Sequence, residues 1–176
     1  NNGWMSQLEK RAKPVIERLL VDGAVTLDAA DQETLALWAV KNAMVFEALR
    51  VGPAWFFTNN ERRTFRESLT PPTRTNIWIA KCVEQPNAYS SALDLSGSVD
   101  GTEARMQAYV TTMAFGSLAV QVLGGKLPTD IPLATTVTAD LRPGPWDRAT
   151  IRIWPRPANA VNWPPAIGLA GDVGIE

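Results

Sequence analysis

The sequence predicts an α+β protein in which N-terminal helices pack on a mostly antiparallel sheet, as two layers of one domain. Apolar residues recur at helical spacing in 1–72 and alternate at strand spacing in 73–176. A chain of 176 residues is also long enough to bury one hydrophobic core. The helical part is therefore predicted at 1–72, and the strand-rich part, which ends in a proline-rich tail, at 73–176.

The first predicted helix covers roughly Trp4–Val21 and is amphipathic. Pro14 lies inside it, and because proline lacks the N–H that a helix needs, we expect a kink or a restart there. Asp22 and Gly23 then favour the end of the helix. Its apolar residues share one face, and they are Leu8, Ala12, Val15, Ile16 and Leu19.

A second helix is predicted at 34–49, after an acidic first turn that begins near Asp28. Its side chains are apolar nearly all round, so we expect it to be the buried centre of the domain. Glu47 is an exception, because burial would raise its pKa unless a base such as Lys41 or Arg50 pairs with it. We favour such an ion pair over a general base, since catalysis usually needs several convergent groups.

A short third helix is predicted after a cap at Asn59 or Asn60, and it ends before Pro71. A turn at 114–117 predicts an antiparallel hairpin between the strands on either side of it. Residues 126–146 are expected to be an irregular excursion, and the later prolines confine the tail to an edge or a surface track. The predicted strands are Asn76–Val83, Ala104–Thr112, Leu118–Leu123 and Ala149–Trp154.

The tryptophans are candidates for core packing or for contact with a partner. Trp38 lies in the most apolar helix and is expected in the core. Trp78 and Trp154 alternate with isoleucines, so both faces of their strands carry bulky apolar groups. Either the sheet is covered on both sides, or one face presents these two tryptophans to a partner. Trp163, which precedes two prolines, is expected to fold back as a lid.

The composition indicates a folded protein without a strong charge bias. Charged residues make up 20% of the chain and the formal net charge is -1, so no global field draws it onto nucleic acid or a membrane. No apolar run approaches the roughly 20 residues of a membrane span, and no secretory signal is visible. We expect a cytoplasmic protein with no membrane partner. The lone Cys82 is expected to be a buried structural thiol.

A basic cluster between residues 61 and 81 is the candidate nucleic-acid-binding site. Guanidinium groups match phosphate oxygens, so arginines one helical turn apart can grip successive phosphates. The alternative is a solvated helix face whose arginines pair locally with Glu61 and Glu67. The five candidate residues are Arg62, Arg63, Arg66, Arg74 and Lys81.

The chain begins Asn1-Asn2-Gly3-Trp4-Met5-Ser6 and continues with Leu8-Glu9 and Ala12-Lys13-Pro14. This opening resembles a segment of bacterial HNH-endonuclease-like proteins that directly follows a Cys-x-x-Cys zinc knuckle. The resemblance covers most of the chain and implies that a nuclease-like module lies upstream of Asn1. Further matches are Trp38-Ala39-Val40-Lys41 with Ala43-Met44, Ile77-Trp78-Ile79-Ala80, Phe115-Gly116-Ser117-Leu118, Trp154-Pro155 and Trp163-Pro164-Pro165.

The chain departs from the HNH pattern in the residues that chemistry requires. An HNH site needs a histidine to activate water, and a structural zinc needs about four Cys or His ligands. This sequence has no histidine and one cysteine. We therefore assign no catalytic residue and no cofactor to it, and we expect zinc or another divalent metal only in the upstream module. A metal-dependent nuclease site would need residues upstream of Asn1.

Three functions remain open. The first is a nonenzymatic companion domain of an HNH-nuclease-like protein, which positions nucleic acid through the basic cluster or supports assembly. The second is a structural module that forms a homo-oligomer or presents its tryptophan-bearing sheet or its tail to a protein partner. The third is a small-molecule-binding enzyme with an aromatic pocket.

Overall fold

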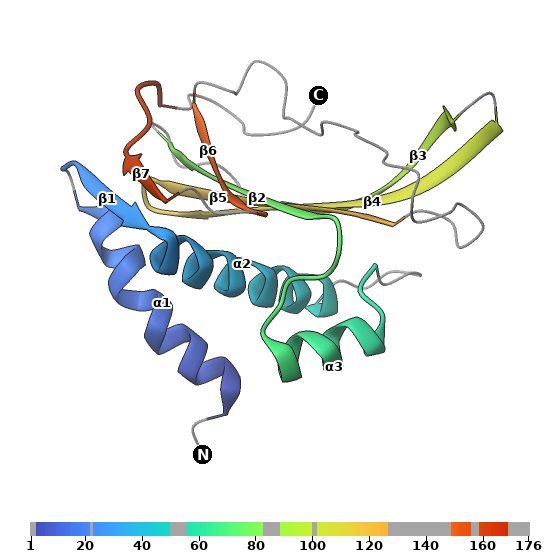
Figure 1. Ribbon diagram of the computed structural model, residues 1–176, viewed down its shortest axis with the longest axis horizontal. Coiled ribbons are helices and arrows are strands. Elements are labelled where there is room, and N and C mark those ends of the chain that lie inside the picture. Colours follow the sequence, from blue (N-terminus) through green and yellow to red (C-terminus); the bar gives the residue numbers. More distant parts are fainter. Residues whose placement is uncertain are drawn as a thin grey trace.

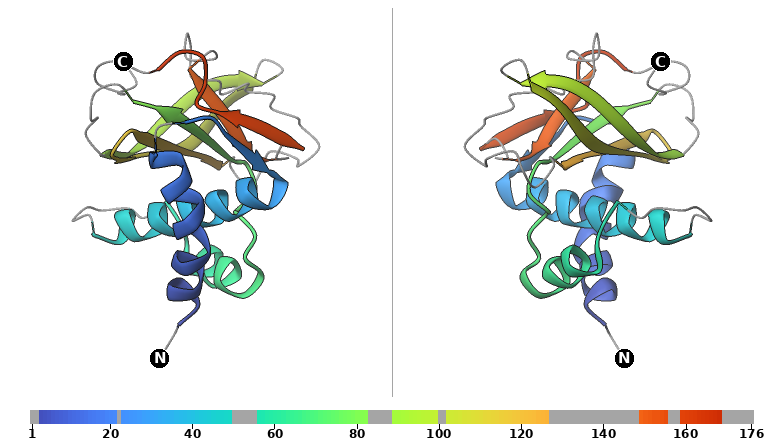
Figure 2. Two further views of the ribbon diagram at one scale, coloured as in Figure 1. Left: turned by 90° about the vertical axis from the view of Figure 1, so that its left-hand side faces the viewer. Right: turned by 90° about the vertical axis from the view of Figure 1, so that its right-hand side faces the viewer.

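In the part of the chain that the structure describes, three helices lie along one side of a five-stranded antiparallel sheet (Figures 1 and 2). This is the α+β arrangement that the sequence predicts. No helix in that part combines the length and the apolar composition that crossing a membrane requires. The arrangement comes from a computed structural model, which describes residues 3–21, 23–49, 56–82, 89–99, 102–126, 149–155 and 159–168.

The first helix, α1 (Trp4–Leu20), is amphipathic and continues through Pro14 without restarting. Pro14 and Lys10 are both exposed, so water can bind the Lys10 carbonyl that loses its N–H partner. The helix ends within one residue of its predicted end, since Val21 is already extended. Four residues of the predicted apolar face are buried, and they are Leu8, Ala12, Val15 and Leu19.

The second helix, α2 (Ala29–Leu49), is the buried centre of the helical layer, as its apolar composition predicts. It follows directly on Asp28, whose Oδ1 accepts the N–H of Asp31 at 2.8 Å. Trp38 is 5% exposed, and its ring centroid lies 5.0 Å from that of Phe115 on the sheet. The expected core position of Trp38 is therefore confirmed.

The main sheet consists of β2 (Thr75–Lys81), β3 (Tyr89–Val99), β4 (Thr102–Phe115), β5 (Leu118–Lys126) and β6 (Thr150–Trp154). Its strand order is β3-β4-β5-β2-β6, and every neighbouring pair is antiparallel. All four predicted strands are present, and β6, which directly precedes Pro155, lies at an edge of the sheet. The pattern missed β3, in which serine and glycine interrupt the apolar alternation. Most of the predicted excursion falls at 127–148, outside the described residues.

A second, two-stranded sheet pairs β1 (Val25–Asp28) with β7 (Ala160–Trp163). Neither strand was predicted, because four residues are too short for a periodicity to show. Trp163 does fold back onto the domain, as expected, but it enters the core and does not form a lid. This side chain is 2% exposed, and its Nε1 donates to the Leu19 carbonyl at 3.1 Å, which anchors β7 to the end of α1.

The two faces of β2 are both covered near its middle. Ile77 and Ile79 belong to the main core between helices and sheet, while Trp78 points to the opposite face and is 6% exposed. Trp154 instead packs against the main core, because its strand partner is Ile77. Trp78 and Trp154 therefore do not share a surface. Cys82 is buried with three alanines, which confirms its expected structural setting.

Candidate binding groove

The third helix, α3 (Asn59–Ser68), carries the predicted basic cluster and is held by a well-formed cap. Its cap residue is Thr58 rather than the predicted Asn59 or Asn60. The Thr58 Oγ1 accepts the Glu61 N–H at 3.1 Å, and the Glu61 carboxylate accepts the Thr58 N–H at 2.8 Å. This reciprocal pair satisfies two donors that the first turn leaves without helical partners. It fixes where α3 begins, and hence which way its arginines point.

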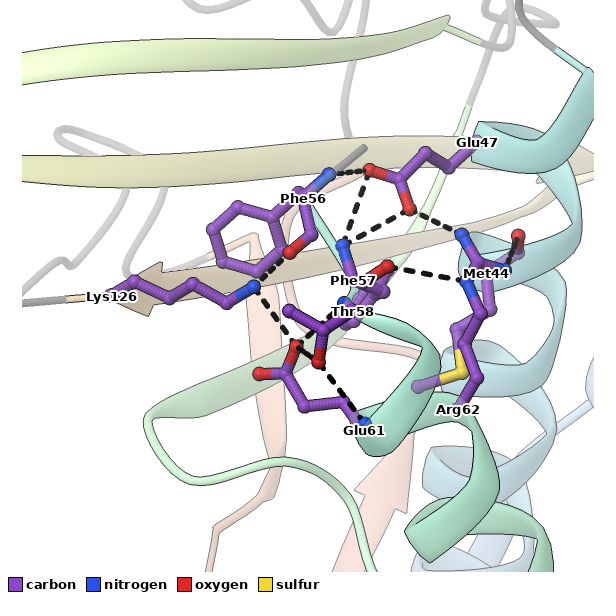
Figure 3. Close-up of polar contacts among 8 residues, drawn as sticks. All are labelled: Met44, Glu47, Phe56, Phe57, Thr58, Glu61, Arg62 and Lys126. Carbon is purple, nitrogen blue, oxygen red and sulfur yellow. Dashed lines mark hydrogen bonds and ion pairs between the residues drawn. The ribbon is translucent and has the colours of Figure 1, made fainter. Parts of the chain in front are cut away.

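The Glu47 carboxylate, which comes from α2, accepts hydrogen bonds from the segment that enters α3 (Figure 3). It accepts the backbone N–H of Phe56 and, at 3.2 Å, that of Phe57. It also forms an ion pair of 2.6 Å with Arg62. The predicted ion pair at Glu47 is thus present, but its base is Arg62. Arg50 lies outside the described residues, and Lys41 pairs with Glu9 instead.

Arg62 is the first of the predicted phosphate-binding residues, and its guanidinium group is turned inward. Besides Glu47, it donates to the Met44 carbonyl at 2.7 Å and to the Phe57 carbonyl at 3.3 Å. Its side chain is 21% exposed. Because these donors are already engaged, Arg62 joins α3 to α2 and is poorly placed to grip a phosphate at the same time.

A second ion pair links α3 to the sheet. The Lys126 Nζ lies 2.9 Å from the Glu61 Oε2, donates to the Phe56 carbonyl, and sits 4.3 Å from the centre of the Phe56 ring. Burial raises the pKa of Glu61, but the hydrogen bonds from Lys126 and Thr58 and the charge of Lys126 outweigh it, so this pKa lies below its ordinary value. The local partner predicted for Glu61 was an arginine of α3, which is wrong, since the partner comes from β5.

A groove of about 420 Å³ runs between the start of α1, the end of α2 and α3. Its floor is apolar, and two of its side chains, Met5 and Leu49, are 45% and 76% exposed. Its remaining walls are cationic. Among the described residues that line it, none is acidic. The apolar lining residues are Trp4, Met5, Met44, Val45, Ala48 and Leu49, and the cationic ones are Lys41, Arg62, Arg63 and Arg66.

The cations of the groove differ in how far they are already neutralised. Lys41 and Arg62 are ion-paired with Glu9 and Glu47, neither of which lines the groove. Arg63 is exposed and donates to the neutral Asn60 side chain at 2.7 Å. Arg66 is exposed one turn further along α3. Arg63 and Arg66 therefore supply the positive charge that the groove offers to a ligand.

The other two predicted basic residues lie away from this groove. Arg74 is exposed in the turn before β2, with a φ of 62°. Lys81 ends β2, and because this strand has seven residues, Arg74 and Lys81 lie roughly 20 Å apart. The structure thus brings Arg62, Arg63 and Arg66 together at one groove, which neither Arg74 nor Lys81 lines.

Comparison of the chain with protein-family models, curated proteins and solved structures finds no match. The resemblance to HNH-endonuclease-like proteins therefore stays a prediction. Sequence reasoning found the arginines of the groove but missed its floor. The sequence does contain one signal of this floor. Apolar residues recur one helical turn apart at the end of α2 and form one stripe, and they are Met44, Val45, Ala48 and Leu49.

Proposed function

We propose that this chain is a nonenzymatic companion domain that holds a protein partner in the groove between α1, α2 and α3. The observation that carries the proposal is the apolar floor, on which Met5 and Leu49 stay 45% and 76% exposed. Exposed apolar side chains gathered in one groove are typical of a binding surface, whereas single scattered ones are ordinary. The resemblance to HNH-endonuclease-like proteins supplies a candidate partner, a nuclease-like module joined ahead of Asn1.

The setting of Glu47 supports a binding role over an enzymatic one. Its carboxylate was the one candidate general base of the second helix, and three donors now occupy it. A general base must be free to take a proton from a substrate. Glu47 instead holds the segment at Phe56 and Phe57 against α2, which shapes one wall of the groove.

Amide hydrogen exchange tests the proposal. The chain is measured alone and joined to the Cys-x-x-Cys module that the resemblance implies. We expect exchange to slow at the start of α1, the end of α2 and α3 when the module is present, because the partner covers those helices, while β1 and β7 stay unchanged. Unaltered exchange around the groove in the joined protein would contradict the proposal.

A matched pair of variants separates the groove from other apolar surface. Leu49→Asp places a charge on the floor and should remove the slowing. Ile167→Asp changes a side chain that is 48% exposed and does not line the groove, so it should leave the slowing intact. Equal behaviour of the two variants would place the partner elsewhere on the domain.

A second candidate function, contact with nucleic acid, is favoured by one observation. Arg63 and Arg66 are exposed one turn apart on α3, which suits two neighbouring phosphates. Arg62→Ala is a poor probe of this contact, because it also breaks the ion pair with Glu47. The variant Arg63→Ala with Arg66→Ala avoids that damage.

Salt-dependent binding of labelled single-stranded and duplex DNA and RNA tests the second candidate. In the variant Arg63→Ala with Arg66→Ala, loss of two phosphate contacts should make the negative slope of log K against log salt shallower by about 2. Arg74→Ala with Lys81→Ala serves as a control, since it also removes two positive charges and neither residue lines the groove. Binding with an unchanged slope in the double variant would exclude α3 as the nucleic-acid contact.

A further inference from the structure

The floor and walls of the groove together define the chemistry of what fits it. Met44, Val45, Ala48 and Leu49 follow the spacing i, i+1, i+4, i+5, which places them in one stripe on α2. Met5 continues the apolar surface from α1. A stripe of this kind is the surface that a second helix packs against, with its own side chains between the ridges. The floor therefore favours a helical ligand with an apolar face.

The hydrogen-bonding needs of the ligand's backbone also favour a helix. The lining of the groove comes from three helices, whose interior backbone groups are bonded within each helix. The described lining residues thus offer no strand edge that could pair with an extended peptide. A segment that enters it must satisfy its own N–H and C=O groups, since leaving them unpaired out of water is costly. A helix does so and an extended segment does not.

The charge of the groove specifies one flank of that helix. Glu9 and Glu47 already neutralise Lys41 and Arg62, so among the described lining residues Arg63 and Arg66, on the α3 wall, are the ones whose charge is left for a ligand. Carboxylates on the flank of the ligand that faces α3 would meet both guanidinium groups, while their aliphatic stems extend the apolar wall. A basic or neutral helix would offer these two guanidinium groups no carboxylate.

We propose that the groove between α1, α2 and α3 binds an acidic amphipathic helix, with its apolar face on the Met44 to Leu49 stripe and its carboxylates on Arg63 and Arg66. This inference rests on the proposed function and specifies its partner. Nucleic acid explains less of the groove. Phosphates gain nothing from an aliphatic floor. Trp4, the one aromatic side chain among the described lining residues, packs edge to face on Phe65 with ring centroids 5.9 Å apart.

Fluorescence anisotropy with designed peptides tests the inference on the 176-residue chain. The probe is a labelled peptide of about 16 residues, long enough to form helix, with leucines at i, i+3, i+4 and i+7, glutamates on one flank and alanines elsewhere. One control peptide has the same residues in an order that scatters the leucines around the helix. A second has lysines in place of the glutamates. We expect the acidic amphipathic peptide to bind at least about tenfold more tightly than either control.

Protein variants then locate the contact. Leu49→Asp should weaken binding at least about tenfold, and because Leu49 is 76% exposed, the variant should fold, which its thermal melt will check. Ile167→Asp should bind as the parent does. Arg63→Glu with Arg66→Glu should reverse the preference from the acidic to the lysine peptide, a result that unfolding cannot produce.

Four results would overturn the inference. The first two are absence of any peptide binding and equal binding of the acidic and lysine peptides. The third is binding that Leu49→Asp does not weaken. The fourth is displacement of the peptide by a single-stranded oligonucleotide whose own affinity falls equally in the Leu49→Asp variant. Hydrogen exchange in the joined protein judges the proposed function separately, so a partner that covers the groove without being an acidic helix is recognised as such.

Discussion

Arg62 on α3 and Glu47 on α2 form an ion pair of 2.6 Å, and the Glu47 side chain is 7% exposed. The same carboxylate accepts two backbone N–H groups ahead of α3. The carboxylate thereby connects two helices that are 10 residues apart in the chain, from Leu49 to Asn59. The groove depends on this connection, because α2 supplies its floor and α3 its cationic wall.

Removal of the Glu47 carboxylate is expected to destabilise the protein strongly. Glu47→Ala leaves the Arg62 guanidinium and the N–H groups of Phe56 and Phe57 without their acceptor, and we expect the free energy of unfolding to fall by about 3 kcal/mol. Urea denaturation monitored by tryptophan fluorescence measures the change. Glu47→Gln keeps a neutral acceptor and should cost less than Glu47→Ala.

Glu33→Ala is the matched control, because Glu33 lies on the same helix with an exposed side chain. It should change stability by no more than about 0.5 kcal/mol. A double-mutant cycle of Glu47→Ala and Arg62→Ala should show a coupling of about 1–3 kcal/mol. Additive losses would mean that the two side chains contribute independently, against the structure.

The Glu61–Lys126 pair predicts a specific loss of stability in acid. The pKa of Glu61 lies below its ordinary value of 4.5 in the folded protein: burial raises it, but the hydrogen bonds from Lys126 and Thr58 outweigh burial. The unfolded chain therefore binds a proton at Glu61 before the folded one does. The stability from this carboxylate is complete above pH 4.5 and is lost as the pH falls through the folded pKa.

Glu61→Gln isolates that contribution, because glutamine does not titrate and still completes the capping box. We expect the free energy of unfolding of the parent to fall more steeply below pH 4.5 than that of Glu61→Gln. Lys126→Met removes the main group that lowers the pKa of Glu61, so the free energy of unfolding of this variant should also fall less steeply below pH 4.5 than that of the parent. Parallel pH profiles for parent and Glu61→Gln would show that Glu61 titrates alike in both states.

Helix positions in this protein were predictable because their patterns are local. The apolar face of α1 and the nearly uniform apolar surface of α2 extend over several turns, so their burial follows from the sequence. Burial of Glu47 was also foreseen, but its partner was not. Arg62 is 15 positions away, and only the packing of α3 against α2 brings the two together.

The missed strands and the groove floor share a physical cause. β1 and β7 have four residues each, and each forms a strand because it pairs with the other, which lies far away in the sequence. Trp163 looked like a tail residue for the same reason, although the Leu19 carbonyl holds it in the core. Leu49 is exposed because α1 and α3 leave the end of α2 uncovered. The spacing of apolar residues along α2 does not show where the other two helices pack.

Cys82 is expected to be chemically inert in the folded protein. The side chain is 4% exposed, and burial raises the pKa of its thiol above the ordinary 9.0, which depletes the reactive thiolate. At pH 8 an aromatic disulfide reagent should react with the folded chain at least about tenfold more slowly than with the urea-unfolded chain. Equal rates would show that the site opens readily to solvent.

Gly124 on β5 is expected to reject even a methyl group. A Cβ at this position would lie 3.2 Å from Cε1 of the Phe56 ring. That ring cannot easily yield, because it stacks on Tyr109 with centroids 5.3 Å apart and carries Lys126 above it. Gly124→Ala should therefore lower the free energy of unfolding by about 1–3 kcal/mol, and Gly124→Val by more.

Phe56→Leu provides the test of this explanation, because the shorter side chain removes the atoms that Gly124→Ala would meet. Phe56→Leu alone should destabilise the core, since Phe56 is 7% exposed. In that background, however, Gly124→Ala should cost at least about 1 kcal/mol less than in the parent, a coupling that chemical denaturation resolves. An undiminished cost would place the penalty in the β5 backbone itself and not in contact with the segment that Glu47 holds against α2.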